Sequence, residues 1–215
     1  MTKTRISALL CLCGLCLCGT SRAADWKDLL NGKNLDGWQV IGTGVWSVLK
    51  DGTLVGQADP QTPFQQQSWL YTKAEFQEFD LRLEYWMRLG SNSGVSIGDK
   101  SRARYAVSGP ESDGHRTPAR IAYEINIDNG QPVDYDITGS IYLIAKAEVG
   151  VQNRTDWNTL EIQARKNLIR VLVNGKVVAE HPGLPERPKA GPIGLQLHDS
   201  RDVVMFRNIQ IKEAQ

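Results

Sequence analysis

The stretch FDLRLEYWMRL at residues 79–89 decides the fold that the sequence predicts. Its odd-numbered positions are apolar, and its even-numbered positions are polar apart from Trp86. Side chains of a β-strand point alternately to opposite faces, so one face of this strand packs on a core while the other meets water. That pattern is typical of an antiparallel sheet with one covered face.

Outward from this stretch the chain reads as short strands separated by turns. Further candidate strands lie at 46–49, 53–55, 68–72, 94–97, 121–128, 140–144, 157–165, 168–173, 176–179, 193–198 and 203–212. KDG at 50–52 and NG at 174–175 are hairpin signals, and residues 25–30 are expected to form a short helical turn. We therefore predict an all-β fold, a two-sheet antiparallel β-sandwich, as a single domain at 24–215.

The first 23 residues have the pattern of an export signal. Lys3 and Arg5 precede an apolar run that is short for a membrane span, and small residues at 21 and 23 predict cleavage after Ala23. All four cysteines lie in this segment, and each follows Leu. A lipoprotein signal has a small residue there, so lipid anchoring is the less favoured alternative. We expect a periplasmic or secreted chain without disulfides.

Composition excludes several other classes. The chain has 25 Lys and Arg against 24 Asp and Glu, and a net charge of +1 gives no reason to expect a nucleic-acid partner. No second apolar run is long enough to span a membrane in the mature chain. His115, His181 and His198 are the only histidines, and no pair has metal-ligand spacing. Neither a metal, another cofactor nor an oligomeric state follows from the sequence.

Polar side chains form rows on two of the predicted strands. Glu124, Asn126 and Asp128 share one face of the strand that contains YEINID, and Gln196 shares a face with His198 on a later strand. Unpaired charge is costly to bury, so each row lies either on a solvated face or in a polar groove. Spacing alone slightly favours the solvated face. In a groove, the same carboxylates and histidine are candidates for acid and base catalysis.

Two details restrict the chemistry of these rows. The Cα atoms of Glu124 and Asp128 are about 13 Å apart on an extended strand, too far for the carboxylate pair of a retaining glycosidase. By parity, Arg207 is expected on the apolar face of the last strand with Met205 and Ile209, where it needs a carboxylate partner. Residues 99–120 are rich in Arg, Ser, Gly and Pro and are expected to form a long functional loop.

Eight segments, in this order, resemble the 3-keto-disaccharide hydrolase family, and they span the mature chain. They are NGKNLDGW (31–38), NSGV (92–95), YEINID (123–128), TGSIY (138–142), WNTLEI (157–162), LVNGK (172–176), GPIGLQLHD (191–199) and VMFRNIQIK (204–212). The resemblance implies a concanavalin A-like jelly roll and an exported bacterial protein that cleaves sugars oxidised to a ketone at C3. It further implies a carbohydrate ligand.

The resemblance also suggests roles for the candidate residues. A ketone at C3 acidifies the C2 proton, so that a base can remove it and the C1 substituent can leave by elimination before water adds. In this hypothesis Glu124 is the base or acid, His198 is a second proton carrier, and Arg207 or Asn92 stabilises the oxyanion. The residues expected to position sugar hydroxyls are Gln196, Asn126, Asp128 and Tyr142.

The chain departs from the family pattern at three positions. Gly98 stands where relatives have Arg, Asn126 where they have Gln, and Asp199 where they have Gly. Arg102 or Arg104 of the long loop is a candidate to supply the missing cation. Two alternatives to an enzyme follow: a non-catalytic, lectin-like carbohydrate-binding module that kept the groove, and a structural cell-envelope domain.

Overall fold

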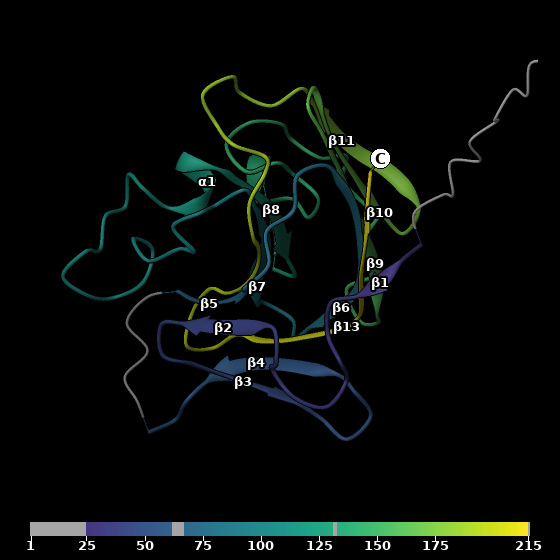
Figure 1. Cartoon of the computed structure of the whole chain (residues 1–215). Coiled ribbons are helices and arrows are strands. Elements are labelled where there is room, and N and C mark those ends of the chain that lie inside the picture. Colours follow the sequence, from purple (N-terminus) through teal and green to yellow (C-terminus); the bar gives the residue numbers. More distant parts are fainter. Residues whose placement is uncertain (1–24, 62–66, 131–132, 215) are drawn as a thin grey trace, which may run out of the picture.

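The computed structural model describes residues 25–61, 67–130 and 133–214, which form two antiparallel sheets packed face to face (Figure 1). The larger sheet has the order β11-β10-β9-β6-β13-β4-β3, with β1 also paired to β13, and the smaller has the order β2-β5-β12-β7-β8. The strands are β1 Lys27–Asp28, β2 Trp38–Ile41, β3 Gly44–Val48, β4 Leu54–Ala58, β5 Ser68–Thr72, β6 Phe79–Met87, β7 Asn92–Ile97, β8 Tyr123–Asp128, β9 Asn158–Arg165, β10 Leu168–Val173, β11 Lys176–His181, β12 Ile193–Leu197 and β13 Val203–Glu213. The helices are α1 Pro118–Ile121 and the 3-10 turn η1 Asp134–Asp136. The predicted sandwich is confirmed, and the predicted signal peptide lies outside the described residues.

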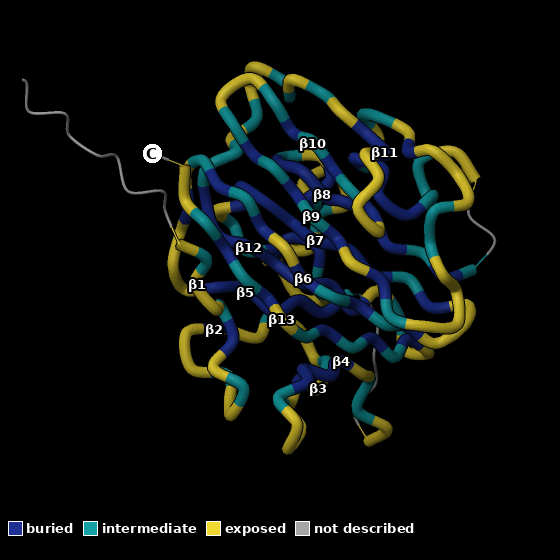
Figure 2. Tube along the Cα trace, turned by 90° about the vertical axis from the view of Figure 1, so that its right-hand side faces the viewer, coloured by how far each residue is buried: buried dark blue, intermediate teal, exposed yellow. Residues whose placement is uncertain are grey.

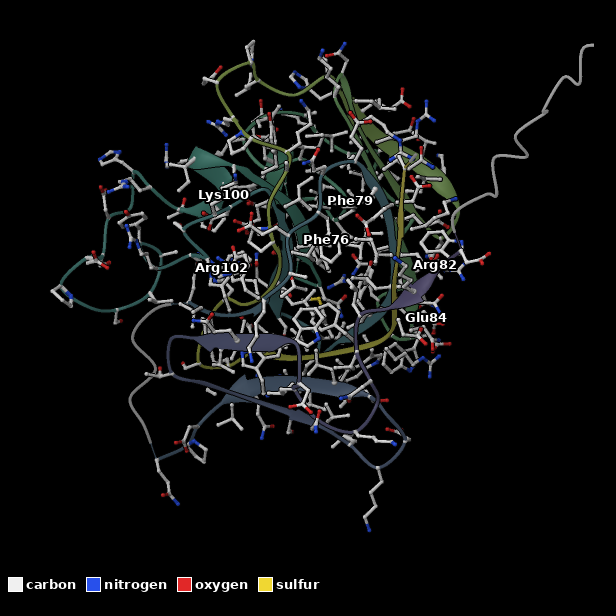
Figure 3. All side chains as sticks on the ribbon, in the orientation of Figure 1. Phe76, Phe79, Arg82, Glu84, Lys100 and Arg102 are labelled. Carbon is white, nitrogen blue, oxygen red and sulfur yellow. The ribbon has the colours of Figure 1, made fainter. Side chains whose placement is uncertain are left out.

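The core lies between the sheets, as the alternation of β6 predicts. The odd-numbered side chains of β6 are at most 3% exposed, and they pack with β7, β8 and β12 of the opposite sheet. Phe76 and Phe79 meet edge to face at 6.2 Å in this interior, whereas Arg82 and Glu84 lie on the outer side of the larger sheet (Figure 3). Exposed residues gather in the loops around the buried strands (Figure 2). No helix among the described residues has the length and apolar character needed to cross a membrane.

Both predicted hairpins are confirmed, because their turn residues adopt the backbone that the turns require. Asn174 and Gly175 both have positive φ, at 50° and 76°, which is typical of a type I′ turn. Two local predictions are wrong, and one strand lies outside the predicted set. Residues 25–30 contain β1 rather than a helical turn, and β2 forms where no strand was expected. Residues 140–144 form turns with isolated bridges, because Leu143 has a φ of 63°, outside the range of a regular strand.

A β-bulge corrects the prediction for the last strand. The pairing of β13 with β6 shifts between Arg207 and Gln210, and Asn208 has a φ of 51°. A bulge inserts one extra residue and reverses the parity that follows it. Phe206 and Ile209 therefore face the core, and Arg207 lies on the outer face.

The long loop predicted at 99–120 crosses the outer side of the smaller sheet and ends in α1 (Figure 1). Asp99, which is 1% exposed, organises its start: one carboxylate oxygen accepts hydrogen bonds from Tyr71 and the backbone of Ala103, and the other from Ser101. Pro118 then begins α1, in keeping with the preference for proline in the first helical turn. Because the helix takes residue 121, β8 starts at Tyr123, two residues later than predicted.

Candidate active site

The polar row of β8 is buried. Ile125 and Ile127 point into the core and are 0% exposed, so Glu124 and Asn126 occupy the opposite face. That face is covered, since Glu124 is 5% exposed and Asn126 2%. The row therefore lies in a polar pocket, and the alternative of a solvated outer face is wrong.

Two separate segments of the sequence cover this face from opposite sides. Residues 138–142 bind to the free edge of β8, where Tyr142 N–H donates to Glu124 O at 2.8 Å and Asn126 N–H donates to Ser140 O at 2.9 Å. On the other side the end of the long loop brings Thr117 and the start of α1 over the sheet. The segment predicted as a strand at 140–144 thus serves as a wall of the pocket.

These elements enclose a pocket of about 320 Å³. The pocket is lined by Gln67, Asn92, Thr117, Ala119, Glu124, Asn126, Asp128, Asp136, Tyr142 and His198. Three of these side chains are carboxylates, and no Lys or Arg occurs among the described residues that line it. The lining is polar enough to recognise hydroxyl groups, but it contributes no permanent positive charge.

Small residues of β7 make room for the larger side chains at the bottom of the pocket. Gly94 lies opposite Asn126 in the sheet. A Cβ atom at Gly94 would be 3.0 Å from Glu124 Oε1 and 3.3 Å from Gln196 Oε1, so both side chains lie against this glycine. Gln196 arrives from β12, which is far away in the sequence but adjacent to β7 in the sheet, and it is 0% exposed.

Burial changes the acidity of Glu124. Removal of the carboxyl from water disfavours its charged form and raises the pKa of Glu124 to about 7. The neighbouring Gln196 amide lowers the pKa of Glu124, but by less than burial raises it, and the amide does not reach hydrogen-bond geometry with the carboxyl group. A carboxyl group with a pKa near neutrality can both take and give a proton, which suits a general base or acid.

Several buried polar atoms beside Glu124 have no hydrogen-bond partner among the described residues. They are both polar atoms of the Gln196 side chain, Ser96 Oγ and Asn92 Oδ1. Leaving such groups unsatisfied costs roughly 1–3 kcal/mol each, so native proteins rarely retain them without a reason. Their concentration on one face of β7 and β12 indicates a site that water or a polar ligand completes.

Asp128 and Asn92 form a fixed pair across β7 and β8. Asn92 Nδ2 donates to Asp128 Oδ2 at 3.1 Å, and the backbone of Gly130 donates to the other oxygen. Asn126 is held by its own side-chain amide, which donates to the carbonyl oxygen of Asp136. These bonds fix the directions of three polar side chains before any ligand arrives.

Tyr142 completes the wall opposite the strands. Burial, and after it the negative charges of Asp136 and Glu124, raise the pKa of Tyr142. The hydroxyl therefore stays protonated and can donate a hydrogen bond into the pocket.

His198 lies at the exposed rim of the same pocket. One of its ring nitrogens and one carboxylate oxygen each of Asp199 and Asp202 lie within 4.8 Å of one another, close enough to share a cation. However, both oxygens of Asp202 accept backbone N–H groups, from Asn92 at 3.1 Å and from Asp199 at 2.7 Å. These carboxylates hold the turn that presents His198, and no other such group occurs within the described part of the chain.

Arg207 is not part of the pocket, which corrects the role predicted for it. Its guanidinium binds Glu84 at 2.7 Å and lies 4.0 Å from the centre of the Trp157 ring. Both contacts are on the outer face of the larger sheet, across the core from Glu124. The bulge in β13 is the reason, because it places Arg207 on the side opposite to the one that parity predicts.

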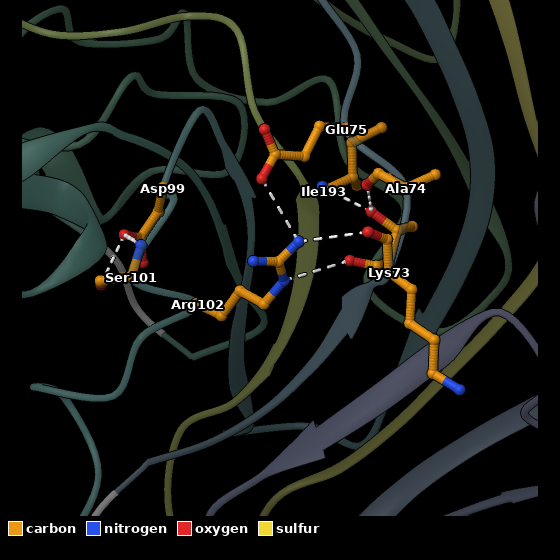
Figure 4. Close-up of polar contacts among 8 residues, drawn as sticks. Lys73, Ala74, Glu75, Asp99, Ser101, Arg102 and Ile193 are labelled. Carbon is orange, nitrogen blue, oxygen red and sulfur yellow. Dashed lines mark hydrogen bonds and ion pairs between the residues drawn. The ribbon is translucent and has the colours of Figure 1, made fainter.

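Arg102 and Arg104, the two candidates from the long loop, do not supply a cation either. Arg102 donates to the carbonyl oxygens of Thr72 and Lys73 and pairs with Glu75 at 3.4 Å (Figure 4). Arg104 binds Tyr105 outside the pocket. The arginine that the family pattern suggests for position 98 cannot be accommodated in this structure: a Cβ atom at Gly98 would lie 2.2 Å from Pro188 O, and the φ of Gly98 is +79°.

The structure thus brings together seven of the eight residues that the sequence proposed, all except Arg207. Sequence reasoning missed Gln67, Thr117, Ala119 and Asp136, which line the pocket, and the floor residue Gly94. Two of them, Thr117 and Ala119, belong to the long loop. The unusual length of this loop pointed to a function, but it did not identify which residues reach the strands.

Comparison with known families gives one match, over nearly the whole described chain. Residues 25–212 match the family model described as the 3-keto-alpha-glucoside-1,2-lyase-like domain. No curated protein matches the sequence.

Solved structures resemble the chain over most of its length. A protein of Parabacteroides distasonis ATCC 8503, provisionally identified as a glycosyl hydrolase, is 26% identical, with a TM-score of 0.68 over 88% of this chain and 100% of that one. The β-glucanase of Bacillus licheniformis has a TM-score of 0.54 at 12% identity, covering 91% and 100% of the two chains. A carbohydrate-binding module, CBM66 of Bacillus subtilis, has a TM-score of 0.51 at 14% identity, covering 82% and 96%. The last two likenesses establish only the jelly-roll fold.

Proposed function

Because this chain belongs to the family of 3-keto-alpha-glucoside-1,2-lyase-like domains, we propose that it binds carbohydrate and cleaves glycosides whose C3 hydroxyl has been oxidised to a ketone. The observation that supports this most strongly is Glu124, a buried carboxyl group with a pKa of about 7 in a polar pocket. The chain is exported to the periplasm or secreted in this proposal.

In the proposed reaction Glu124 is the general base. The C3 ketone makes the neighbouring C2 proton acidic, and the Glu124 carboxylate removes that proton. The electrons form a C1–C2 double bond as the C1–O bond breaks and the leaving oxygen takes a proton. Water then adds across the double bond: its hydroxyl joins C1, its other proton goes to the group that protonated the leaving oxygen, and Glu124, whose proton exchanges with the solvent after elimination, delivers a proton to C2. One carboxyl group near neutrality suffices, so the wide separation of Glu124 and Asp128 is no obstacle.

His198 protonates the leaving oxygen in this scheme. It lies at the solvent-exposed rim of the pocket, where an imidazole exchanges protons with water between turnovers. A leaving alcohol at this rim also has a direct path out.

The developing negative charge on the C3 oxygen is stabilised by neutral donors. Tyr142 contributes its hydroxyl, and Asn92 the second N–H of an amide whose first N–H is bound to Asp128. Preorganised donors in a dry site lower the energy of a developing oxyanion without a full cation. Asn126, Asp128 and Gln196 hold the sugar hydroxyls.

The test is to incubate the purified chain with 3-keto-trehalose in D₂O and to follow the products by NMR. Elimination followed by hydration places deuterium at C2 of the released 3-keto sugar, whereas direct hydrolysis leaves the original hydrogen. Glu124→Gln should abolish both cleavage and exchange. Full activity of this variant, or cleavage with hydrogen retained at C2, contradicts the mechanism. Saturable binding without any cleavage would instead support the non-catalytic, lectin-like module.

A further inference from the structure

A second pocket of about 230 Å³ adjoins the polar one. The two share Asp128, which lines both. The Asp128 carboxylate contacts each side: one oxygen accepts from Asn92 in the polar pocket, and the other accepts from Gly130, which lines the second. Asp128 is therefore the residue that the linings of the two spaces have in common.

The second pocket differs in chemistry. Three branched aliphatic side chains, those of Ile137, Val149 and Val151, line it. The rest of the lining consists of two glycines and the polar side chains of Asp128, Thr138, Glu148, Gln152 and Arg154. Val149 is 71% exposed, the highest value among the large apolar side chains of the described chain. No aliphatic side chain larger than that of Ala119 lines the polar pocket. One space is suited to hydroxyl groups and the next to an apolar group.

The walls of the second pocket are fixed by hydrogen bonds. Thr138 Oγ1 accepts the backbone N–H of Asp128 at 2.9 Å and donates to Gln152 Oε1 at 2.8 Å. Arg154 donates to the carbonyl oxygen of Asn129 at 3.0 Å, and the Asn129 amide donates back to Arg154 O at 2.9 Å. These hydrogen bonds attach the segment that carries Val149 and Val151 to the end of β8. Binding of a ligand would therefore lose little free energy in ordering this segment.

We propose that the second pocket is the subsite for the aglycone, and that it selects glycosides whose leaving group is aromatic or otherwise apolar over those that carry a second hexose. The inference rests on the proposed function, because it needs the sugar ring in the polar pocket with its C1 substituent directed past Asp128. A hexose would place hydroxyls against the apolar surface of Ile137, Val149 and Val151, where only those near the polar part of the lining find a partner, whereas a phenyl ring buries this apolar surface.

The experiment compares benzyl and methyl 3-keto-glucosides of the same anomeric configuration. Benzyl alcohol and methanol are leaving groups of similar acidity, so a difference in kcat/KM reports on binding of the aglycone rather than on bond breaking. The benzyl glycoside should be preferred by about tenfold or more. Val149→Asp places a charge in the pocket and should remove most of this preference by lowering kcat/KM for the benzyl glycoside.

Leu49→Asp is the matched control, because it charges another exposed aliphatic residue in a loop, 44% exposed and at the β3–β4 hairpin. It should leave the benzyl preference intact. Equal rates for the two glycosides, or a preference that Val149→Asp does not change, overturns the subsite, while cleavage of the methyl compound upholds the proposed function.

Binding of benzyl glucoside, measured by ligand-observed NMR, separates the remaining outcomes. Binding that Val149→Asp abolishes, without cleavage of either keto-glycoside, supports the subsite and refutes the proposed function. Absence of both binding and cleavage overturns both.

Discussion

Replacement of Glu124 by Gln tests the pocket through stability as well as through activity. Burial raises the pKa of Glu124 from 4.5 to about 7, so between these values the folded chain holds a proton that the unfolded chain releases. Stability must then fall as pH rises from about 4.5 to about 7 and level off above that. The full shift corresponds to about 3 kcal/mol.

Glutamine has a similar shape and cannot ionise, so the variant escapes this loss. We compare the free energy of unfolding of Glu124→Gln with that of the parent chain. From pH 5 to pH 8 this difference should change by about 2–3 kcal/mol in favour of the variant. Guanidinium unfolding at both pH values measures the gain. Glu186→Gln, on the exposed loop between β11 and β12, is the control and should leave the difference from the parent chain constant.

The same substitution should abolish catalysis, with a loss of about 10²–10⁴ in rate that is typical for a general base or acid. In the parent chain kcat/KM should rise with pH through about 7, because the carboxylate is the active form of a base. A profile without that rise contradicts the role of Glu124 as the base, whereas a decrease at higher pH is expected from loss of the proton of the acid His198. If the stability difference between the variant and the parent chain is the same at pH 5 and pH 8, the carboxyl is solvated and the pocket interpretation fails.

Three further substitutions have distinct expected results. His198→Asn should lower kcat/KM by about 10²-fold or more, with unchanged unfolding; a smaller effect refutes its role as the acid. Arg207→Gln should leave kcat/KM within about twofold and lower stability by about 1 kcal/mol, because its ion pair is half-exposed on the outer face; loss of activity would refute that placement. Gly98→Ala should cost about 3 kcal/mol in denaturant unfolding, but Gly90→Ala only about 1 kcal/mol, since both have φ near +80° and only Gly98 meets a backbone atom. Equal losses would show that the contact with Pro188 is not limiting.

The sequence predicted the class of fold because strand periodicity is a local property. Alternation in β6 reports directly which side chains face a core, and the Asn174-Gly175 pair specifies its turn through backbone preferences alone. In the same way, parity placed Glu124, Asn126 and Asp128 on one face of β8. Parity failed for Arg207 because a bulge at Asn208 has no clear signature in the residues themselves.

The resemblance to a known family nominated the residues of the site, but no local pattern could show that they meet. Gln196 reaches Glu124 because β12 lies next to β7 in the sheet, although about a hundred residues separate these strands. Asp136 and Thr117 join the pocket because separate loops fold over the same face.

By itself, then, the sequence determined most of the strands, the two faces of β6 and β8, and the identity of the polar row. Only the tertiary structure decided that this row is buried in a pocket rather than exposed to solvent. Burial is what makes Glu124 a candidate catalytic residue. The physical reason is that desolvation depends on everything that surrounds a group. The loops that exclude water from Glu124, and thereby raise its pKa, come from parts of the chain that periodicity cannot connect to it.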